Sequence, residues 1–485
     1  MMDIPVRSEK LSWRTKIGFG LGDIYGGGAG IVVSFYYLYF LTDIIRINPA
    51  LAGTAFLISK LDDAVTDPFE GVLTDRTRTP LGRRRPYLLA GILLIFISVF
   101  LMWNPVKSPA EGARFVYVIA TYLFFSTVIS IVMTSYNALA AELTLDYNER
   151  TSVSSIRIFF STFASILAAV LPLEIVKLAP DTRTGYIWMG LFFGAFFALP
   201  FLVTFFSTRE RPEFQKPNEP FSLKRIFIEP FRVKTFVIVL LMYLLAFVAM
   251  DTVSSIVIYF MKYYLNRGGE ANYVSGALLV AQVASLPFYV WLSRRTSKRS
   301  GYLVGAVIWM ATMLFSFAIV PGAPGFYVYL VAVMVGLGTG GIVVMIYAMF
   351  PDIPDVDELQ SGERREGTYS AITTFMRKLS SAVALFFVSN ALAITGYRAP
   401  VEETVNGVVQ VVEQVQTAEF LGALRFIFAI TPMGLVGLAL IAAMRYPLDA
   451  KTHARLSAVL RCKRAGEPLD AQQEREVNEL RERLV

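Results

Sequence analysis

The sequence holds little of what soluble proteins use for chemistry. Its 485 residues include one cysteine, Cys462, and one histidine, His453, both close to the C-terminal end. A disulfide needs two cysteines and a Cys/His metal centre needs several such ligands, so both are excluded. Charged residues make up only 17% of the chain. No Walker A sequence occurs in it, so ATP is not indicated as an energy source.

Hydrophobic residues dominate what is present. They account for 55% of the chain, aromatic residues for 14%, and the mean hydropathy is +0.54. A water-soluble globule of this length needs more polar surface, so the sequence predicts a membrane protein. The first residues, MMDIPVRSEKLSWRTK, include no short apolar run closed by small residues. We therefore expect no cleaved signal peptide.

Twelve stretches are apolar and long enough to cross a bilayer, which takes about 20 residues per helix. The interruption at 208–234 is the longest and divides them six and six, so it is interpreted as a cytoplasmic linker. We predict an all-α membrane protein, with one six-helix half in 1–207, the other in 235–446, and a polar tail at 447–485. The predicted spans are 17–42, 50–74, 87–104, 113–143, 153–178, 185–207, 235–264, 273–292, 301–320, 326–350, 367–397 and 419–446.

Lysine and arginine collect in alternate loops. They are frequent after span two, in the central linker and after span eight, and sparse in the loops between. Basic loops stay in the cytoplasm, so we expect both termini there, in the inner (plasma) membrane of a bacterium. The net charge of +7 comes from these loops. Since no soluble domain carries a clustered basic face, nucleic acid is not an expected partner, whereas the lipid bilayer is.

The polar tail carries apolar residues at helical spacing, which predicts two short amphipathic helices on the cytoplasmic side. These residues are Leu456, Val459, Leu460, Val477, Leu480 and Leu484. Such helices either cover a surface or make a regulatory contact, and the sequence leaves both open.

Span two carries charge where lipid is expected. At 100° per residue, four of its charged side chains share an arc of about 80°: Lys60, Asp63, Asp67 and Glu70. A charge at the bilayer centre costs at least about 3 kcal/mol, so these residues are candidates for function. Two carboxylates one turn apart suit Na⁺, which takes oxygen ligands, or a shared proton. The alternative is a Lys60 ion pair that only joins helices, with Glu70 close to the membrane surface.

Several motifs resemble those of one transporter family. GVLTDRTRTPLGRRRP, between spans two and three, resembles the loop motif of the major facilitator superfamily. With five other segments it resembles the glycoside-pentoside-hexuronide:cation symporters, the melibiose permease type, over nearly the whole chain. These segments are KLDDAVTDP, GFGLGD, YNALAAELTLDYNERT, RIFFSTFASIL and RREGTYSAITTFMRKLSSA. A related branch of the superfamily transports lysophosphatidylcholine with sodium.

The resemblance implies a cation site and a solute site. In the family the helix-two aspartates bind the coupling ion, Na⁺ or H⁺, and hydroxyls of helix four assist; no other cofactor is expected. The matching residues here are Asp63, Asp67, Ser130 and Thr134. Lys60 stands where the family usually has arginine, and Lys60 and Lys378 are the expected coupling residues. The residues expected to touch solute are Asp23, Tyr136, Asn137, Arg157 and Lys378.

The loop after span two is expected to be a gate and not a binding site. Charge-assisted bonds to helix ends and to acidic side chains would hold the cytoplasmic side closed. The expected gate residues are Asp75, Arg76, Arg83, Arg84, Arg85 and Glu142.

We therefore expect a transporter, not an enzyme: a monomer that moves a small solute, a sugar or glycoside, together with Na⁺ or H⁺ by alternating access. Met133 stands where melibiose permease has a helix-four aspartate, so an amphiphilic anionic solute such as a lysophospholipid is the alternative. A channel would need a continuous polar lining. An integral-membrane enzyme would need a nucleophile with its base, or a metal site.

Overall fold

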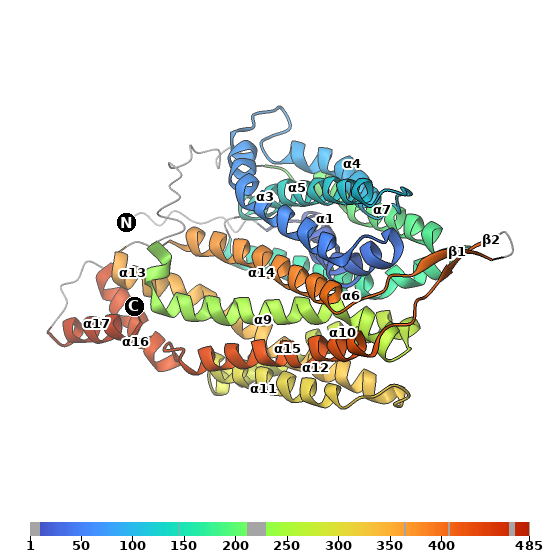
Figure 1. Cartoon of the computed structure of the whole chain (residues 1–485). Coiled ribbons are helices and arrows are strands. Elements are labelled where there is room, and N and C mark those ends of the chain that lie inside the picture. Colours follow the sequence, from blue (N-terminus) through green and yellow to red (C-terminus); the bar gives the residue numbers. More distant parts are fainter. Residues whose placement is uncertain are drawn as a thin grey trace. The chain divides into compact units, whose positions relative to one another are not determined.

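The chain divides into two units, each built around long helices (Figure 1). The computed structural model describes residues 10–144, 146–210, 229–362, 365–405, 408–464 and 471–484. Unit 1 comprises Met1–Glu219 and Ser389–Thr417, and unit 2 comprises Pro220–Val388 and Ala418–Val485. Nearly all the described residues are helical, as predicted.

Unit 1 holds six long helical segments. The first is continuous through α1 (Trp13–Leu21), α2 (Asp23–Val32) and the π-helical stretches η1 (Val33–Tyr37) and η2 (Phe40–Ile45), and Arg46, at a φ of 62°, ends it. The others are α3 (Pro49–Arg76), α4 (Arg85–Met102), α5 (Glu111–Leu143), α6 (Tyr147–Lys177) and α7 (Thr182–Ser207). α2 packs on α6, both α3 and α4 pack on α5, and α4 also packs on α7.

Polar side chains define where several helices begin. Asn48 accepts a hydrogen bond from the backbone of Ala50 at the start of α3, and Pro49 occupies the first helical position, where its missing N–H costs nothing. Asp146 accepts one from the backbone of Glu149 at the start of α6. Within the apolar stretches that follow, a helix satisfies most of its backbone groups internally, as a membrane requires.

Eleven helical segments of the described chain are long and apolar enough to cross a membrane. α3 is not one of them, although its 28 residues would extend about 42 Å against a bilayer core of about 30 Å. Its charged side chains, from Lys60 to Glu70, reduce its apolar character. Because α3 has the required length and packs on α5, we count it as the twelfth spanning helix that the sequence predicts.

Unit 2 also holds six long helices. The first, α9 (Lys234–Tyr259), continues as η5 (Phe260–Tyr264), and Asn266, at a φ of 55°, follows. The others are α10 (Ala271–Arg295), α11 (Lys298–Phe317), α12 (Gly325–Met349), α14 (Glu366–Ile394, of which the last residues belong to unit 1) and α15 (Ala418–Met444). α15 lies between α9 and α11 (Figure 1). The shorter helices η4 (Glu229–Arg232), η6 (Gly268–Glu270), η7 (Phe350–Asp352) and α13 (Ile353–Ser361) were not predicted.

The tail forms the two predicted amphipathic helices, α16 (Ala450–Arg464) and α17 (Ala471–Leu484), and all six apolar residues named above are buried. α13 packs against both helices. Arg455 of α16 pairs with Glu476 of α17 at 2.6 Å, and the hydroxyl of Thr235 at the start of α9 donates to the carbonyl of Leu484 at 2.5 Å. The tail is therefore docked on unit 2.

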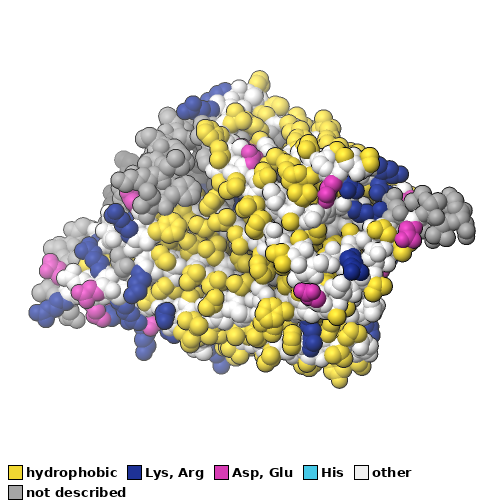
Figure 2. Space-filling model, viewed as in Figure 1, with side chains coloured by type: hydrophobic (Ala, Val, Ile, Leu, Met, Phe, Trp, Pro, Cys, Tyr) yellow, Lys and Arg dark blue, Asp and Glu magenta, His cyan; other side chains and the backbone are white. Residues whose placement is uncertain are grey.

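Lipid-facing character is visible on the surface. On the face in Figure 2, hydrophobic side chains spread over the long helices of unit 2, whereas Lys and Arg gather around α16 and α17. Large exposed apolar residues on these helices include Leu241, Phe288, Leu314 and Leu438. In a soluble protein such residues would form an extended apolar patch, while in a bilayer they face acyl chains.

One segment crosses from unit 2 to unit 1. After α14 the chain forms an antiparallel hairpin of β1 (Val401–Val405) and β2 (Val408–Val412), in which Val401 pairs with Val412. This hairpin was not predicted. Ser389–Thr417, which contains it, belongs to unit 1. The hydroxyl of Tyr397 donates to Asp43 of η2 at 2.6 Å, so a buried carboxylate of unit 1 holds this segment.

Candidate functional site

The paired aspartates of α3 meet two serines of α5. Ser126 donates a hydrogen bond to Asp63, 2.8 Å from Oγ to Oδ1, and Ser130 donates one to Asp67. Both pairs are 63 residues apart, so the two helices run parallel and in step here. Because side chains four residues apart share a helix face, this packing places both carboxylates on one row of hydroxyls.

Lys60 occupies the other side of Asp63. Its ammonium lies 2.7 Å from Oδ2 of Asp63, 3.1 Å from Oγ of Ser126 and 5.9 Å from the ring centroid of Tyr122. The two aspartates and Lys60 together carry a net charge of −1 when all are ionised. One monovalent cation would therefore neutralise the group, and its carboxylate and hydroxyl oxygens are the donors that a hard cation takes.

Sequence reasoning named Ser130 and Thr134 but not Ser126; a role of Thr134 in cation binding stays a prediction. Thr134 makes no hydrogen bond to a side chain within the described ranges. The signal for Ser126 was present, since Ser126, Ser130 and Thr134 follow one another at intervals of four residues. Among the described residues, no group of three or more His, Cys, Asp or Glu side chains lies close enough to hold a metal ion. Asp63, Asp67, Ser126 and Ser130 form a donor set of another kind, with two carboxylates and two hydroxyls.

Four of the residues expected to touch solute lie together in unit 1. Nη2 of Arg157 lies 3.2 Å from Oδ1 of Asp23 and donates to Oδ1 of Asn137 at 2.8 Å. The guanidinium lies 4.9 Å from the ring centroid of Tyr136. Nε of Arg157 is buried and bonds to no acceptor in the part of the chain that the structure describes. The side chain of Arg157 is 23% exposed, so its guanidinium can also donate to a bound polar group.

Gly26 leaves room for the side chains of Asp23 and of Met133 on α5. A Cβ at Gly26 would lie 2.7 Å from Oδ1 of Asp23 and 2.6 Å from Cε of Met133. Met133 therefore lies beside Asp23 and gives this side of the cluster an apolar group.

Lys378 lies half-buried on α14 in unit 2, whereas the paired aspartates and the Asp23 cluster belong to unit 1. Its expected contact with both sites stays a prediction. Its neighbour Arg377 forms an ion pair with Asp251 of α9, 2.6 Å from Nη1 to Oδ2, which the motifs did not indicate.

The arginines of the predicted gate bind within unit 1. Arg83 pairs with Glu142 at 2.7 Å, Nη1 of Arg84 donates to Thr74 at 2.8 Å, and Nη2 of Arg85 donates to the carbonyl of Phe205 at 3.0 Å. Arg76 is exposed, and the side chain of Asp75 lies outside the described residues. A closing contact between the halves stays a prediction.

Glu210, which sequence reasoning missed, caps the start of α4. Its carboxylate accepts hydrogen bonds from the backbone N–H groups of Arg83, Arg84 and Arg85, at 2.6, 2.6 and 2.7 Å. A carboxylate at this place also interacts favourably with the positive end of the helix dipole. Gly82, at a φ of 108°, leaves room for it, because a Cβ there would lie 2.7 Å from the Glu210 carboxyl group.

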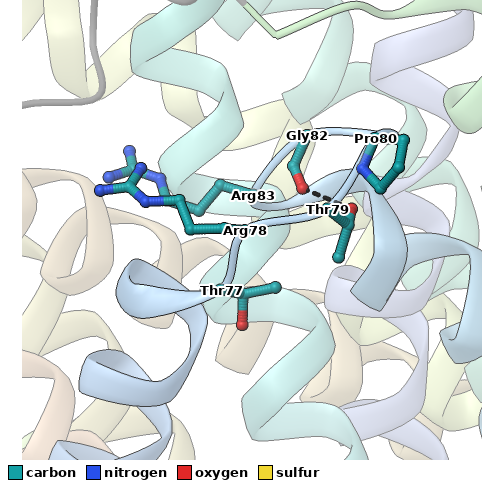
Figure 3. A pocket seen from close by; sticks show the side chains of 6 residues that line it. All are labelled: Thr77, Arg78, Thr79, Pro80, Gly82 and Arg83. Atoms are coloured by element: carbon teal, nitrogen blue, oxygen red, sulfur yellow. Dashed lines mark hydrogen bonds between the residues drawn. The ribbon is translucent and has the colours of Figure 1, made fainter.

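The loop also encloses a small hollow, lined by Thr77, Arg78, Thr79, Pro80, Gly82 and Arg83. Figure 3 shows the side chains of Arg78 and Arg83 extending in the same direction, while Thr79 donates to the carbonyl of Gly82 at 2.7 Å. Thr77 is about 15 Å along α3 from Asp67. The hollow therefore belongs to the loop and not to the paired aspartates.

Two units of spanning helices, with carboxylates held inside the spans by hydroxyls and arginine, define a polytopic membrane transporter. Over residues 18–450 the chain matches the family described as MFS/sugar transport protein. It therefore belongs to this family of the major facilitator superfamily, and the predicted resemblance and the predicted transporter class are confirmed.

The relatives are symporters and carriers. An isoprimeverose transporter of Lactiplantibacillus pentosus is 26% identical over 95% of this chain and 94% of its own. A glucuronide carrier protein homolog of Escherichia coli is 27% identical over 92% and 94%. The sodium-dependent lysophosphatidylcholine symporter 1-A of Danio rerio is 23% identical over 93% and 89%.

A solved structure supports the predicted fold. The inward-open xylose transporter XylE from E. coli aligns with a TM-score of 0.61 and 14% identity, over 92% of this chain and 98% of that one. At this identity the likeness concerns the fold alone, and it agrees with the major facilitator architecture.

Proposed function

We propose that the protein carries out symport of a sugar or glycoside with one Na⁺ or H⁺. The observation that carries the proposal is the alignment of Asp63 and Asp67 with Ser126 and Ser130 on two parallel spanning helices. Burying two carboxylates in a membrane is costly. A cation that binds and leaves explains why both carboxylates are there. A purely structural ion pair with Lys60 does not explain Asp67.

Charge neutralisation links ion binding to movement. Without a cation, the carboxylates of α3 keep a net negative charge even when Lys60 is counted. A bound cation removes that charge, so the loaded carrier can close around it at lower electrostatic cost. Lys378 competes with the cation for the aspartates in this scheme, which couples ion binding to solute binding.

The Asp23 cluster is the proposed solute site of unit 1. Asp23, Asn137 and Arg157 offer acceptors and donors side by side, and Tyr136 offers an aromatic face. This chemistry suits the hydroxyls and ring of a sugar. The names of the isoprimeverose transporter and the glucuronide carrier homolog support a sugar as solute. The name of the lysophosphatidylcholine symporter supports the amphiphilic alternative, and also supports Na⁺ as the ion. Met133 beside Asp23 is the local feature that favours this alternative.

The remaining features follow from this function. The arginine-rich loops face the cytoplasm in the proposed orientation, with both termini on that side of a bacterial inner membrane. The loop from Asp75 to Arg85 is the proposed cytoplasmic gate. A monomer has both units and is the proposed functional form.

Transport by purified protein in liposomes tests the proposal. Uptake of a panel of radiolabelled sugars, p-nitrophenyl glycosides and a lysophospholipid is measured under a Na⁺ gradient and, separately, under a pH gradient. Concentration of a sugar or glycoside against its gradient supports the proposal. If only the lysophospholipid accumulates, the alternative is correct. Passive currents without accumulation of any solute contradict symport.

A further inference from the structure

Unit 2 contains an ion pair with its own aromatic wall. Arg377 of α14 donates two hydrogen bonds to Asp251 of α9, one of 2.6 Å from Nη1 to Oδ2 and one of 3.0 Å from Nη2 to Oδ1. The guanidinium lies 4.6 Å from the ring centroid of Phe247, one turn before Asp251. We propose that this pair is a second solute-binding site, which takes hydroxyl groups of an uncharged glycoside; it rests on the sugar symport proposed above.

The pair repeats the design of the Asp23 cluster. In each unit an arginine of the fifth long helix binds an aspartate of the first, and lies over a phenylalanine four residues before that aspartate: Phe19 at 5.8 Å in unit 1 and Phe247 at 4.6 Å in unit 2. Arg377 follows Arg157 by 220 residues, and Asn266 follows Arg46 by the same interval. The two arginines therefore lie on corresponding helices of the two units, at the same sequence interval as the residues that follow the two first helices.

The repeat is not a copy. Asp251 follows Asp23 by 228 residues, so it lies about two turns further along the first helix of its unit. The phenylalanine moves with the aspartate in both units. The carboxylate, its ring and the arginine are thus kept together as a group although their level on the helix differs. Two unrelated ion pairs that only joined helices would have no reason to share this ring.

Arg377 is more exposed than its carboxylate partner. Its side chain is 35% exposed, while that of Asp251 is 6% exposed. Arg377 lies well inside a spanning helix, where exposure of a guanidinium to lipid is strongly unfavourable. Its exposed part is where the proposed solute would bind. Apart from Ser380, at 3.4 Å from Nη1, only Asp251 accepts a side-chain hydrogen bond from it among the described residues.

The chemistry favours an uncharged solute. Asp251 and Arg377 neutralise one another, so an anion would have to displace Asp251 and leave a buried carboxylate unpaired. A hydroxyl can accept from a remaining N–H of Arg377 without breaking the pair. Behind the guanidinium the rings of Phe247 and Tyr243 are buried, with centroids 4.5 Å apart. The ring of Tyr347 has its centroid 6.2 Å from that of Phe247 and is 51% exposed. It can therefore pack against the C–H face of a pyranose.

Binding measurements on the full-length protein test the site. The probes are p-nitrophenyl glycosides, including β-glucoside and β-glucuronide, which differ only in CH₂OH against COO⁻. Dissociation constants are measured by calorimetry in saturating Na⁺ for wild type, Arg377→Lys, Phe247→Leu and the exchange variant Asp251→Arg/Arg377→Asp. Arg425→Lys is the matched control, since Arg425 donates to the carbonyl of Phe317 and lies over its ring. Solute-free melting and Na⁺ affinity are recorded for each.

We expect Arg377→Lys and Phe247→Leu to raise the dissociation constant of the tightest-binding uncharged glycoside at least 10-fold, with Na⁺ affinity within 2-fold of wild type. The exchange variant should regain the melting temperature without regaining glycoside affinity. Wild-type affinity in Arg377→Lys, or full recovery of affinity in the exchange variant, would show that the pair only joins α9 and α14. Tighter binding of the glucuronide than of the glucoside by wild type would overturn the uncharged class.

The experiment distinguishes failure of the second site from failure of sugar symport. If wild type binds no member of the panel, sugar symport itself is wrong and the second site is lost with it. If wild type binds and transports a glycoside while the Arg377 and Phe247 variants match the Arg425→Lys control, only the second site is wrong.

Discussion

The hydroxyl of Ser126 donates a hydrogen bond to Asp63, 2.8 Å away, and also lies 3.1 Å from the ammonium of Lys60. A serine that contacts both a carboxylate and its lysine partner can hold the carboxylate in place while the coupling cation binds and leaves. Ser126→Ala is therefore expected to raise the Na⁺ concentration for half-maximal uptake at least about 10-fold, because a hydrogen bond to a charged group contributes about 1.5–3 kcal/mol.

The control for this change is Thr127→Ala, because Thr127 is the next residue on α5 and its hydroxyl donates only to the backbone of Leu123. Uptake is measured in proteoliposomes over a range of Na⁺ concentrations. Equal Na⁺ dependence in the two variants would remove Ser126 from the cation site.

Asp63→Asn and Asp67→Asn should both abolish cation-driven accumulation, but they should differ in stability. Asp63→Asn leaves Lys60 without its carboxylate in a buried place, which costs about 3–5 kcal/mol, so its melting temperature should fall further. Adding Lys60→Met to Asp63→Asn should restore the melting temperature and not the transport. Concentrative uptake by either single variant at the wild-type level would refute the assignment.

Lys378→Ala should uncouple transport. The predicted competition between its ammonium and the cation disappears, so solute should equilibrate across the membrane without being concentrated. Counterflow and gradient-driven uptake are compared in the same liposomes, with the exposed tail variant Lys451→Ala as control. Normal concentrative uptake by Lys378→Ala would make the lysine a structural residue.

Gly82→Ala should destabilise unit 1. The residue adopts a φ of 108° and its new Cβ would lie 2.7 Å from the carboxyl group of Glu210. The left-handed backbone alone costs a side chain about 1–2 kcal/mol, and displacement of Glu210 would add to that. Gly112→Ala, where a Cβ meets open space, is the control, and thermal unfolding in detergent is the measurement. The idea fails if both variants melt alike, and Glu210→Ala should lower stability in the same direction as Gly82→Ala.

The docking of the tail should depend on pH through His453. Its Nε2 lies 3.6 Å from Asp355 and 3.8 Å from Asp352, and these two carboxylates raise the pKa of His453, against the opposing effects of burial and Lys298. A raised pKa in the folded state means that protonated His453 stabilises the fold fully below pH about 6.5. This contribution is lost as the pH rises through the folded pKa.

The melting temperature of wild type should therefore exceed that of His453→Gln at pH 5.5, and the difference should vanish at pH 8.5. The pair is partly exposed, so the effect should be no more than about 1 kcal/mol. A difference that is the same at both pH values would mean that His453 acts through packing alone.

Local sequence patterns were sufficient to predict the helices and the acidic face of α3. Apolar runs predict the spans because a bilayer imposes a fixed length, and a rotation of 100° per residue places Asp63 and Asp67 on one side. The same reasoning found the apolar stripes of α16 and α17. Each of these depends only on residues that are neighbours along one helix.

Pairings between helices were harder to predict. The contact of Ser126 with Asp63 depends on how far α5 is shifted along α3, and the bond between Asp251 and Arg377 depends on the rotation of two helices distant in sequence. Glu210 lies in a stretch that reads only as linker, so nothing local indicates that it caps α4. Family motifs indicated the residues of unit 1 around Arg157, whereas in unit 2 they indicated Lys378 and not the pair of Asp251 and Arg377.

The path of Ser389–Thr417 affects whether the protein can be cut into two separate units. This segment leaves unit 2, is held through Tyr397 by the buried carboxylate of Asp43, and then returns. A protease cut in the central linker would not release two self-sufficient fragments, because the downstream fragment carries an arm that completes the upstream one. Fragments expressed separately should thus reassemble by docking this arm, and at high concentration two intact molecules could exchange arms and form a swapped dimer.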